Sequence, residues 1–272
     1  MKILNNIDYE REFPIGSYSY DFKVKNYLIE IDPYATHNST WGIRNNPPKS
    51  SNYHKQKSDL AKENGYFCIH KFDWDDSQKI IELLKTNEQI GARECQVKEI
   101  SREEAKNFIN HYHLQNYAQD SIRLGLFYEN KLVSIMTFGK PRYNKNYEYE
   151  LIRYCSSLNI IGGSEKLFKY FTKNYNPTSV ISYCDEAKFS GNTYLKLKFN
   201  LLRSGRPAKH WYNPKTQQHF TDNLVRQRGV DQLLNTSFGK GTSNEVLLLE
   251  HNFVEIFDCG QATYVWKKKP QE

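Results

Sequence analysis

Three carboxylates and one imidazole stand close together in the stretch 20-YDFKVKNYLIEIDPYATHNS-39, namely Asp21, Glu30, Asp32 and His37. Because the ends of paired strands meet, Asp21 and Glu30 should approach closely enough to hold one divalent cation, with Asp32 on the same face as Glu30. Oxygen ligands without cysteine suit Mg²⁺ or Mn²⁺, which can activate water and neutralise charge on a phosphate during in-line attack. An imidazole beside such a site can carry protons near neutral pH.

The elements that must position these groups follow from the apolar pattern. Two short apolar runs, 13–22 and 24–32, predict strands joined by a tight turn. Residues 54–64 then predict a polar helix, 66–74 a buried strand and 75–87 a second helix. The first part therefore has the order β-β-α-β-α, and we expect its domain to span residues 1–92.

The segments YDF, LIEID, ATHN, YHKQK, ENGY and CIHKFDWDD, in this order, resemble the very-short-patch-repair-like endonucleases and their phage homing relatives. This branch of the PD-(D/E)XK superfamily is matched over roughly residues 9–90. The resemblance implies a restriction-endonuclease-like domain in which Asp21 is the principal metal ligand and Glu30-Ile31-Asp32 corresponds to the (D/E)XK element. His37 would be the catalytic histidine, and His54 would lie near a later acid or histidine of the site.

Two positions depart from that family's pattern. Asp32 stands where many relatives have lysine. The relatives also have an upstream helix that contributes a glutamate, and here only Glu10 and Glu12 precede Asp21 closely. The chain would therefore either work without this helix or be a shortened copy with reduced or no activity.

Residues 93–272 predict a second domain, opening with a helix at 101–114. Three antiparallel strands at 122–155, a helix after 160-IIGGSEKLF-168 and a strand at 178–185 follow, and a hairpin at 253–269 closes the chain. This order resembles the GNAT acyltransferases, whose turn before the central helix binds the pyrophosphate of coenzyme A. Gly162 and Gly163 occupy the corresponding place, although the fuller glycine motif of that family is absent.

The same second part, over roughly residues 95–268, also resembles segments that phage-encoded endonuclease-like proteins carry beside other nuclease modules. That resemblance implies a targeting or substrate-binding module. The chain has a net charge of +7: residues 93–272 carry +8 (26 basic minus 18 acidic residues), and residues 1–92 carry −1 (12 minus 13). Cations can pair with phosphates while aromatic rings stack on bases. The predicted DNA contacts are Arg142, Lys145, Arg203, Arg206, Lys209, Trp211, Arg226 and Arg228.

No apolar run approaches the ~20 residues that a membrane-spanning helix needs, and the five cysteines form no CxxC pair. The expected location is the cytoplasm, here that of a phage-infected cell. We therefore predict a mixed α/β protein with a nuclease-like and a GNAT-like domain, acting as a Mg²⁺-dependent DNA endonuclease of homing type. Two alternatives stay open: a GNAT-like acyltransferase modifying nucleic acid or protein, and a non-catalytic DNA-binding protein with a decayed nuclease domain. The oligomeric state is not predicted.

Overall fold

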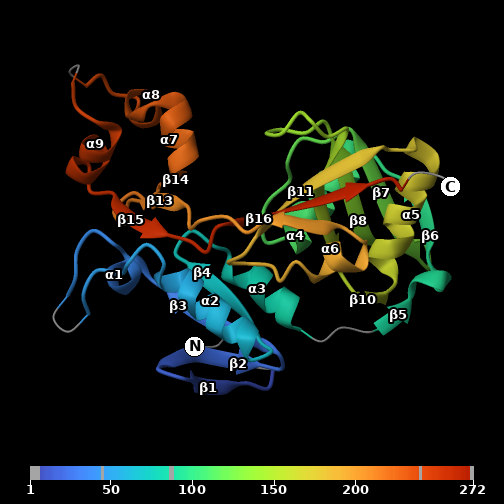
Figure 1. Cartoon of the computed structure of the whole chain (residues 1–272), viewed down its shortest axis with the longest axis horizontal. Helices are drawn as coiled ribbons and strands as arrows, with labels where there is room; N and C mark the ends of the chain where they lie inside the picture. The colour runs from blue at the N-terminus through green and yellow to red at the C-terminus, as the bar shows by residue number, and fades with distance from the viewer. Residues whose placement is uncertain (1–6, 44–45, 86–88, 239–240, 270–272) are drawn as a thin grey trace.

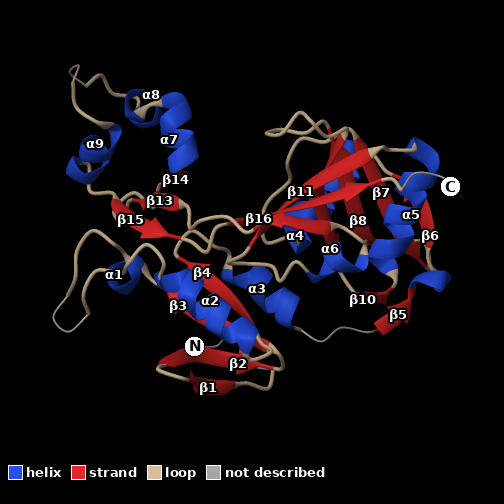
Figure 2. Cartoon of the chain, in the orientation of Figure 1, coloured by secondary structure: helices blue, strands red, loops and turns tan. Residues whose placement is uncertain are grey.

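The computed structural model of the chain describes residues 7–43, 46–85, 89–238 and 241–269. Figure 1 shows one lobe built from the N-terminal strands and a second lobe built on the largest sheet, with helices α7, α8 and α9 standing apart above the first. Figure 2 shows that helices and strands are mixed in both lobes. The described residues include no helix long and apolar enough to cross a membrane.

The N-terminal sheet has the order β1-β2-β3-β4. Its strands are β1 (Glu10–Ile15), β2 (Tyr18–Val24), β3 (Tyr27–Asp32) and β4 (Phe67–Phe72). The first three strands are antiparallel, and β4 runs parallel to β3. Lys25, at φ 55°, makes the tight turn between β2 and β3. The predicted hairpin is confirmed, and β1 extends it by one further strand.

Two helices cover opposite faces of this sheet. Because successive residues of a strand point to opposite sides, Leu28 and Ile29 of β3 face different layers. Leu28 packs in one cluster with Ala61 of α2 (Tyr53–Glu63), and Ile29 packs in another with Ile80 of α3 (Ser77–Leu84). The short helix α1 (Tyr34–His37) follows β3 directly, so residues from β3, α1 and α2 come together at one end of the sheet.

The largest sheet has seven strands in the order β12-β16-β11-β9-β8-β7-β6. Its strands are β6 (Gln96–Glu99), β7 (Ile122–Tyr128), β8 (Lys131–Gly139), β9 (Tyr149–Ser156), β11 (Ser179–Asp185), β12 (Asn200–Arg203) and β16 (Gln261–Lys267). Three helices lie between its strands in the sequence: α4 (Arg102–Tyr112) before β7, α5 (Gly163–Tyr175) before β11 and α6 (Asn192–Lys196) before β12. A small parallel pair, β5 (Gln89–Gly91) with β10 (Asn159–Ile161), and the 3₁₀ turn η1 (Ala92–Glu94) lie at its edge.

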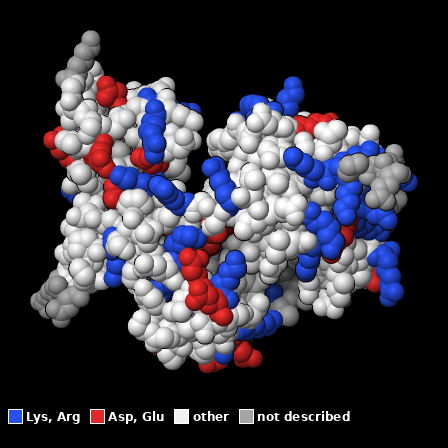
Figure 3. Space-filling view, in the orientation of Figure 1, with Lys and Arg blue, Asp and Glu red and all other residues white. Residues whose placement is uncertain are grey.

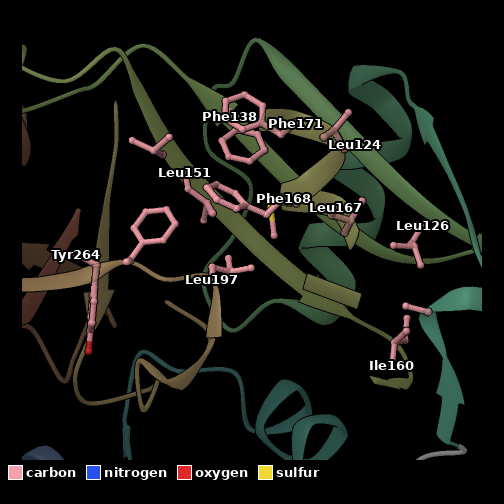
Figure 4. Close-up of a cluster of buried hydrophobic side chains, with 14 of the residues drawn as sticks. Leu124, Leu126, Phe138, Leu151, Ile160, Leu167, Phe168, Phe171, Leu197 and Tyr264 are labelled. Carbon is pink, nitrogen blue, oxygen red and sulfur yellow. The ribbon is translucent and has the colours of Figure 1, made fainter. Parts of the chain in front are cut away.

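Helix α5 supplies the principal core of this lobe. Leu167, Phe168 and Phe171 turn one face of the helix toward the sheet, as spacings of one, three and four residues require. The Phe171 ring stacks on Phe138 of β8 at a centroid distance of 3.7 Å. Figure 4 shows these rings among the buried side chains of β7, β8 and β9. Helix α4 packs in a separate cluster with Ile135 and Cys155.

The chain leaves the large sheet between β12 and β16 to build a third unit. Its strands are β13 (Lys209–Tyr212), β14 (His219–Thr221) and β15 (Val254–Phe257), in the order β14-β13-β15. Its helices are α7 (Asp222–Arg228), α8 (Val230–Leu234) and α9 (Asn244–Glu250). The predicted hairpin at 253–269 is therefore wrong: β15 and β16 belong to different sheets, because the Asp258-Cys259-Gly260 turn redirects the chain between them.

Candidate active site

The predicted metal ligands Asp21 and Glu30 are each engaged within the fold. Asp21 Oδ2 accepts a hydrogen bond from the backbone N–H of Ile31 at 2.6 Å. Glu30 is 3% exposed and lies 2.5 Å from the ammonium of Lys57 on α2. Burial raises the pKa of Glu30 to about 7, an effect that the charge of Lys57 opposes. Asp21 thus stabilises strand β3 through the backbone of Ile31, and Glu30 forms a buried ion pair with Lys57.

Asp32, His37 and His54, by contrast, converge. Asp32 is fully buried, and its Oδ1 lies 2.9 Å from His37 Nδ1 and 3.6 Å from His54 Nε2. A third imidazole, His70 of β4, places Nδ1 2.7 Å from the other oxygen of Asp32. Burial opposes ionisation of Asp32, yet the neighbouring imidazoles, His70 first among them, hold its pKa well below the usual range. Sequence reasoning missed His70, although it lies in the quoted CIHKF strand.

The second site lies where β9 and β11 separate. These parallel strands pair at only two positions, Tyr149 with Val180 and Glu150 with Ile181. Beyond them the strands diverge around a cavity of about 210 Å³, here called the splay cavity. Its walls include Leu151, Arg153, Tyr183, Ser190, Thr193 and Tyr194. Tyr27, Phe67 and Leu83 of the N-terminal lobe cover one side, so both lobes shape it.

The turn at Gly162 and Gly163 stands beside the same strand, β9. Gly162 has φ 77°, a left-handed conformation that favours glycine, and it caps α5. Within the described part of the chain, no acceptor is hydrogen-bonded to the backbone N–H groups of Gly163 and Ser164. Such free donors at a helix N-terminus suit an anion. Glu165, however, places a carboxylate in the first turn of this helix, where it would repel a diphosphate.

A larger hollow of about 1130 Å³ lies between the two lobes and the third unit, and we call it the interlobe cleft. Figure 3 shows it as the notch between the unit that carries α7 and the large lobe. It is lined by Trp74 from the N-terminal lobe, Tyr143 from the large lobe and Arg226 from the third unit. Gln115, Tyr183 and Lys188 line both this cleft and the splay cavity, so the two hollows share a wall.

Asp185 ends β11 on this shared side. Its carboxylate accepts hydrogen bonds from Gln115 Nε2 at 3.1 Å and from the backbone N–H of Ala187 at 3.0 Å. Burial raises its pKa to about 6, although the charge of Lys188 opposes the shift. A carboxylate with a pKa near the working pH and a place in a cleft is suited to accept protons.

Three hydrogen-bonded side chains, Asp258, His210 and His219, also border the cleft, and we call them the His210 relay. Asp258 Oδ2 lies 3.0 Å from His210 Nε2, and His210 Nδ1 lies 2.8 Å from His219 Nε2. The His219 ring stacks on Trp74 at 4.2 Å between centroids, and burial lowers its pKa to about 3. The sequence did not indicate this arrangement, because its members lie on β13, on β14 and after β15.

The predicted DNA contacts do not form one basic face. Arg142 pairs with Glu150, Lys209 with Glu245 and Glu255, and Arg226 with Asp222. Trp211 is 1% exposed in the core of the third unit, so its ring is not available to a base. Lys145 contacts the Pro141 carbonyl and, with Arg203, lines the cleft, while Arg206 and Arg228 are exposed. Figure 3 shows Lys and Arg scattered over the large lobe.

His113, which also lines the splay cavity, predicts a pH dependence of stability. Burial lowers its pKa to about 3, and the nearby charge of Arg153 acts in the same direction. The unfolded state takes up this proton near pH 6.5, so the free energy of unfolding should fall as the pH decreases from 6.5 toward 3. Urea unfolding at several pH values should show a weaker dependence for His113→Gln. The exposed His111→Gln is the matched control, and equal pH dependence in both variants would refute the prediction.

No protein-family model matches the chain, and no curated protein sequence matches it. Among solved structures, an acetyltransferase of Bacillus subtilis in complex with CoA is 10% identical, with a TM-score of 0.34 over 64% of this chain and 98% of its own. An N-acetyltransferase of Staphylococcus aureus Mu50 has a TM-score of 0.35 at 10% identity, over 64% and 99%. A GNAT family acetyltransferase of Elizabethkingia anophelis with acetyl-CoA bound has a TM-score of 0.32 at 11% identity, over 64% and 99%.

The described sheets and helices confirm the predicted mixed α/β class. Helix α4, the three antiparallel strands β7, β8 and β9, helix α5 and strand β11 follow one another in the order predicted for the second domain. The turn before α5 and the two strands that open around the splay cavity belong to this part of the chain. The division at residue 92 stays a prediction, as does a location in the host cytoplasm.

The prediction of a Mg²⁺-dependent DNA endonuclease, a hydrolase of the homing type, is wrong. The two predicted metal ligands do not form a shared metal site, because Glu30 is paired with Lys57 and Asp21 is hydrogen-bonded to the backbone of Ile31. A nuclease domain over residues 9–90 is not shown, and the cations give no support for DNA as the partner.

Proposed function

We propose that this chain transfers an acyl group from acyl-coenzyme A to a nucleophile held in the interlobe cleft. One observation carries the proposal: the splay cavity and the interlobe cleft share the wall formed by Gln115, Tyr183 and Lys188, beside the carboxylate of Asp185. A donor entering from one side and an acceptor entering from the other would meet there. Binding two reactants in adjacent hollows can supply much of the rate enhancement of a transfer reaction.

The splay cavity suits the pantetheine arm of the donor. The diverging strands leave a narrow space walled by apolar and aromatic side chains, including Leu151 and Tyr194. The diphosphate would lie toward the first turn of α5, where the free N–H groups of Gly163 and Ser164 can act as donors. When bound, acyl-coenzyme A supplies an activated thioester carbonyl.

Asp185 would accept the proton that the nucleophile loses. Its pKa of about 6 leaves it ionised near pH 7, and Gln115 holds one of its oxygens in place. The acceptor's N–H or O–H proton passes to this carboxylate as its nitrogen or oxygen bonds to the acyl carbon. The carbon–sulfur bond breaks, and the thiolate leaves and takes up a proton.

The acceptor would be an amine or hydroxyl on a sizeable molecule. The cleft is larger than most small-molecule sites, which reach about 1,000 Å³. Its charged groups are mixed, since Asp75, Asp222 and Asp258 stand among the cations. A mixed lining with Trp74 and Tyr143 favours a polar acceptor with an apolar or aromatic portion over a uniform polyanion.

Filling the splay cavity tests the donor site. Thr193→Trp on α6 should abolish binding of acetyl-coenzyme A, because the indole would occupy the space between the strands. Lys196→Trp adds the same ring to the exposed side of the same helix and should bind as the wild type does. Isothermal titration calorimetry measures both, and equal affinities for the two variants would contradict the assignment.

Removing the first-turn carboxylate should strengthen binding. Glu165→Gln eliminates a negative charge at the N-terminus of α5, an effect worth about 0.3–1 kcal/mol, or about two- to fivefold in the dissociation constant. The gain should shrink at high salt, because exposed charges are screened. Glu103→Gln, in the first turn of α4, is the control and should leave the affinity for acetyl-coenzyme A unchanged. An unchanged affinity in Glu165→Gln would place the diphosphate elsewhere.

A further inference from the structure

Three ligand-type atoms meet at the carboxyl end of β3, and none of them takes part in the proposed transfer. Asp32 Oδ1 lies 2.9 Å from His37 Nδ1 and 3.6 Å from His54 Nε2, and the two imidazole nitrogens are 3.2 Å apart. They come from β3, α1 and α2, so the fold assembles a small triangle of one oxygen and two nitrogens. Zinc-type bonds of about 2.0–2.1 Å in tetrahedral geometry separate neighbouring ligand atoms by about 3.3 Å. The three observed distances between ligand atoms, 2.9, 3.2 and 3.6 Å, lie on both sides of that separation.

Hydrogen bonding alone leaves this triangle unsatisfied. Asp32 Oδ1 is buried and makes no hydrogen bond, although His37 Nδ1 lies 2.9 Å away. His54 Nδ1 lies 2.6 Å from the carbonyl of Phe257, so in the neutral ring that nitrogen carries the proton and Nε2 presents a lone pair. A buried acceptor without a partner costs about 1–3 kcal/mol. His37 Nδ1 and His54 Nε2 share a hydrogen bond, whereas Asp32 Oδ1 has no such partner; a cation within the triangle would coordinate all three atoms.

The surroundings orient these atoms as a metal site requires. His70 Nδ1, 2.7 Å from Asp32 Oδ2, fixes the carboxylate, and the Phe257 carbonyl fixes the His54 ring. Such outer hydrogen bonds commonly orient metal ligands. The His37 side chain is 14% exposed, so a fourth position can open toward the surface. Lys57 is already paired with Glu30, and the His70 imidazole faces the other carboxylate oxygen of Asp32.

We propose that Asp32, His37 and His54 bind one divalent cation of the zinc and cobalt class. Two imidazole nitrogens and one carboxylate favour such borderline ions over Mg²⁺, which prefers oxygen ligands in octahedral geometry. This donor set differs from the all-oxygen set of Asp21, Glu30 and Asp32 that the sequence predicted. Because His54 also contacts Phe257, the bound ion would tie the N-terminal lobe to the strand β15.

Titration of the metal-stripped full chain with Co²⁺ tests this inference without any activity assay. The wild type should bind one Co²⁺ and show the intense visible bands of a tetrahedral ion, and Zn²⁺ should displace it while millimolar Mg²⁺ should not. His37→Ala, a change close to the surface, should weaken binding by at least about tenfold. His111→Ala, an exposed histidine on α4, is the control and should bind as the wild type does.

A readout of stability accompanies this titration. Saturating Zn²⁺ should raise the thermal midpoint of the wild type and of His111→Ala, because the ion binds the folded state, and should leave that of His37→Ala nearly unchanged. Absence of Co²⁺ bands in the wild type would overturn the proposal. Equal affinity of wild type and His37→Ala would overturn the assignment of the ligands.

Discussion

Replacing Asp185 by asparagine should lower the rate of acyl transfer by about 10²- to 10⁴-fold, the usual contribution of a positioned general base. The amide keeps the size and can still meet Gln115, but it cannot accept a proton from the acceptor. Affinity for acetyl-coenzyme A should be unchanged, since Asp185 does not line the splay cavity. Steady-state kinetics with acetyl-coenzyme A and a panel of amine and hydroxyl acceptors measures the rate, and calorimetry the affinity.

The pH profile distinguishes this role from a structural one. With a pKa of about 6, Asp185 is protonated below that pH and cannot act as a base, so the rate should rise through pH 6 and level off above it. The inflection should disappear in Asp185→Asn. Glu186→Gln changes the next carboxylate, which does not line the cleft, and should keep the wild-type rate and profile. A wild-type rate in Asp185→Asn would refute the assignment.

The second large effect concerns the buried ion pair of Glu30 and Lys57. Lys57→Met should lower the free energy of unfolding by about 3–5 kcal/mol, because it leaves a buried carboxylate without its partner. Lys57 Nζ also donates to the Ser19 carbonyl at 2.9 Å, and that bond is lost as well. Denaturant unfolding followed by circular dichroism measures the change.

Two further variants isolate the cause of that destabilisation. The double variant Lys57→Met with Glu30→Gln removes the unpaired charge and should recover much of the loss. Lys55→Met, on the same helix, breaks the surface pairs with Asp59 and Glu186 and a hydrogen bond to Ser204, and should cost less than about 1 kcal/mol. A loss below 1 kcal/mol for Lys57→Met would show that the pair contributes little.

The sequence predicted local elements well because their causes are local. The apolar runs of the first hairpin act within a few residues, and so does the capping box of Ser101 with Glu104 that begins the predicted helix at 101–114; the structure contains both elements. The predicted order of a helix, three antiparallel strands, a turn, a helix and a strand is present as α4, β7, β8, β9, the turn before α5, α5 and β11. The closing hairpin at 253–269 failed because partner choice is decided in three dimensions. Strand β15 pairs with β13, and β16 lies between β12 and β11.

Predicting the sites was harder, since side chains meet through the fold rather than through spacing. Glu30 and Asp32 were assigned one role from their shared face, yet the former meets Lys57 and the latter meets three histidines. No pattern in the sequence indicated that Asp185 or the His210 relay would line a site. Their significance arises only when β11, β13 and the turn after β15 meet at one cleft.

The most direct test of the central claim is a crystal structure of the full chain with coenzyme A bound. We expect the pantetheine arm between β9 and β11, its sulfur beside the wall of Gln115 and Tyr183 that faces the interlobe cleft, and its diphosphate near the first turn of α5. Coenzyme A bound away from these strands, or no binding at concentrations that saturate ordinary acyltransferases, would contradict acyl transfer by this chain.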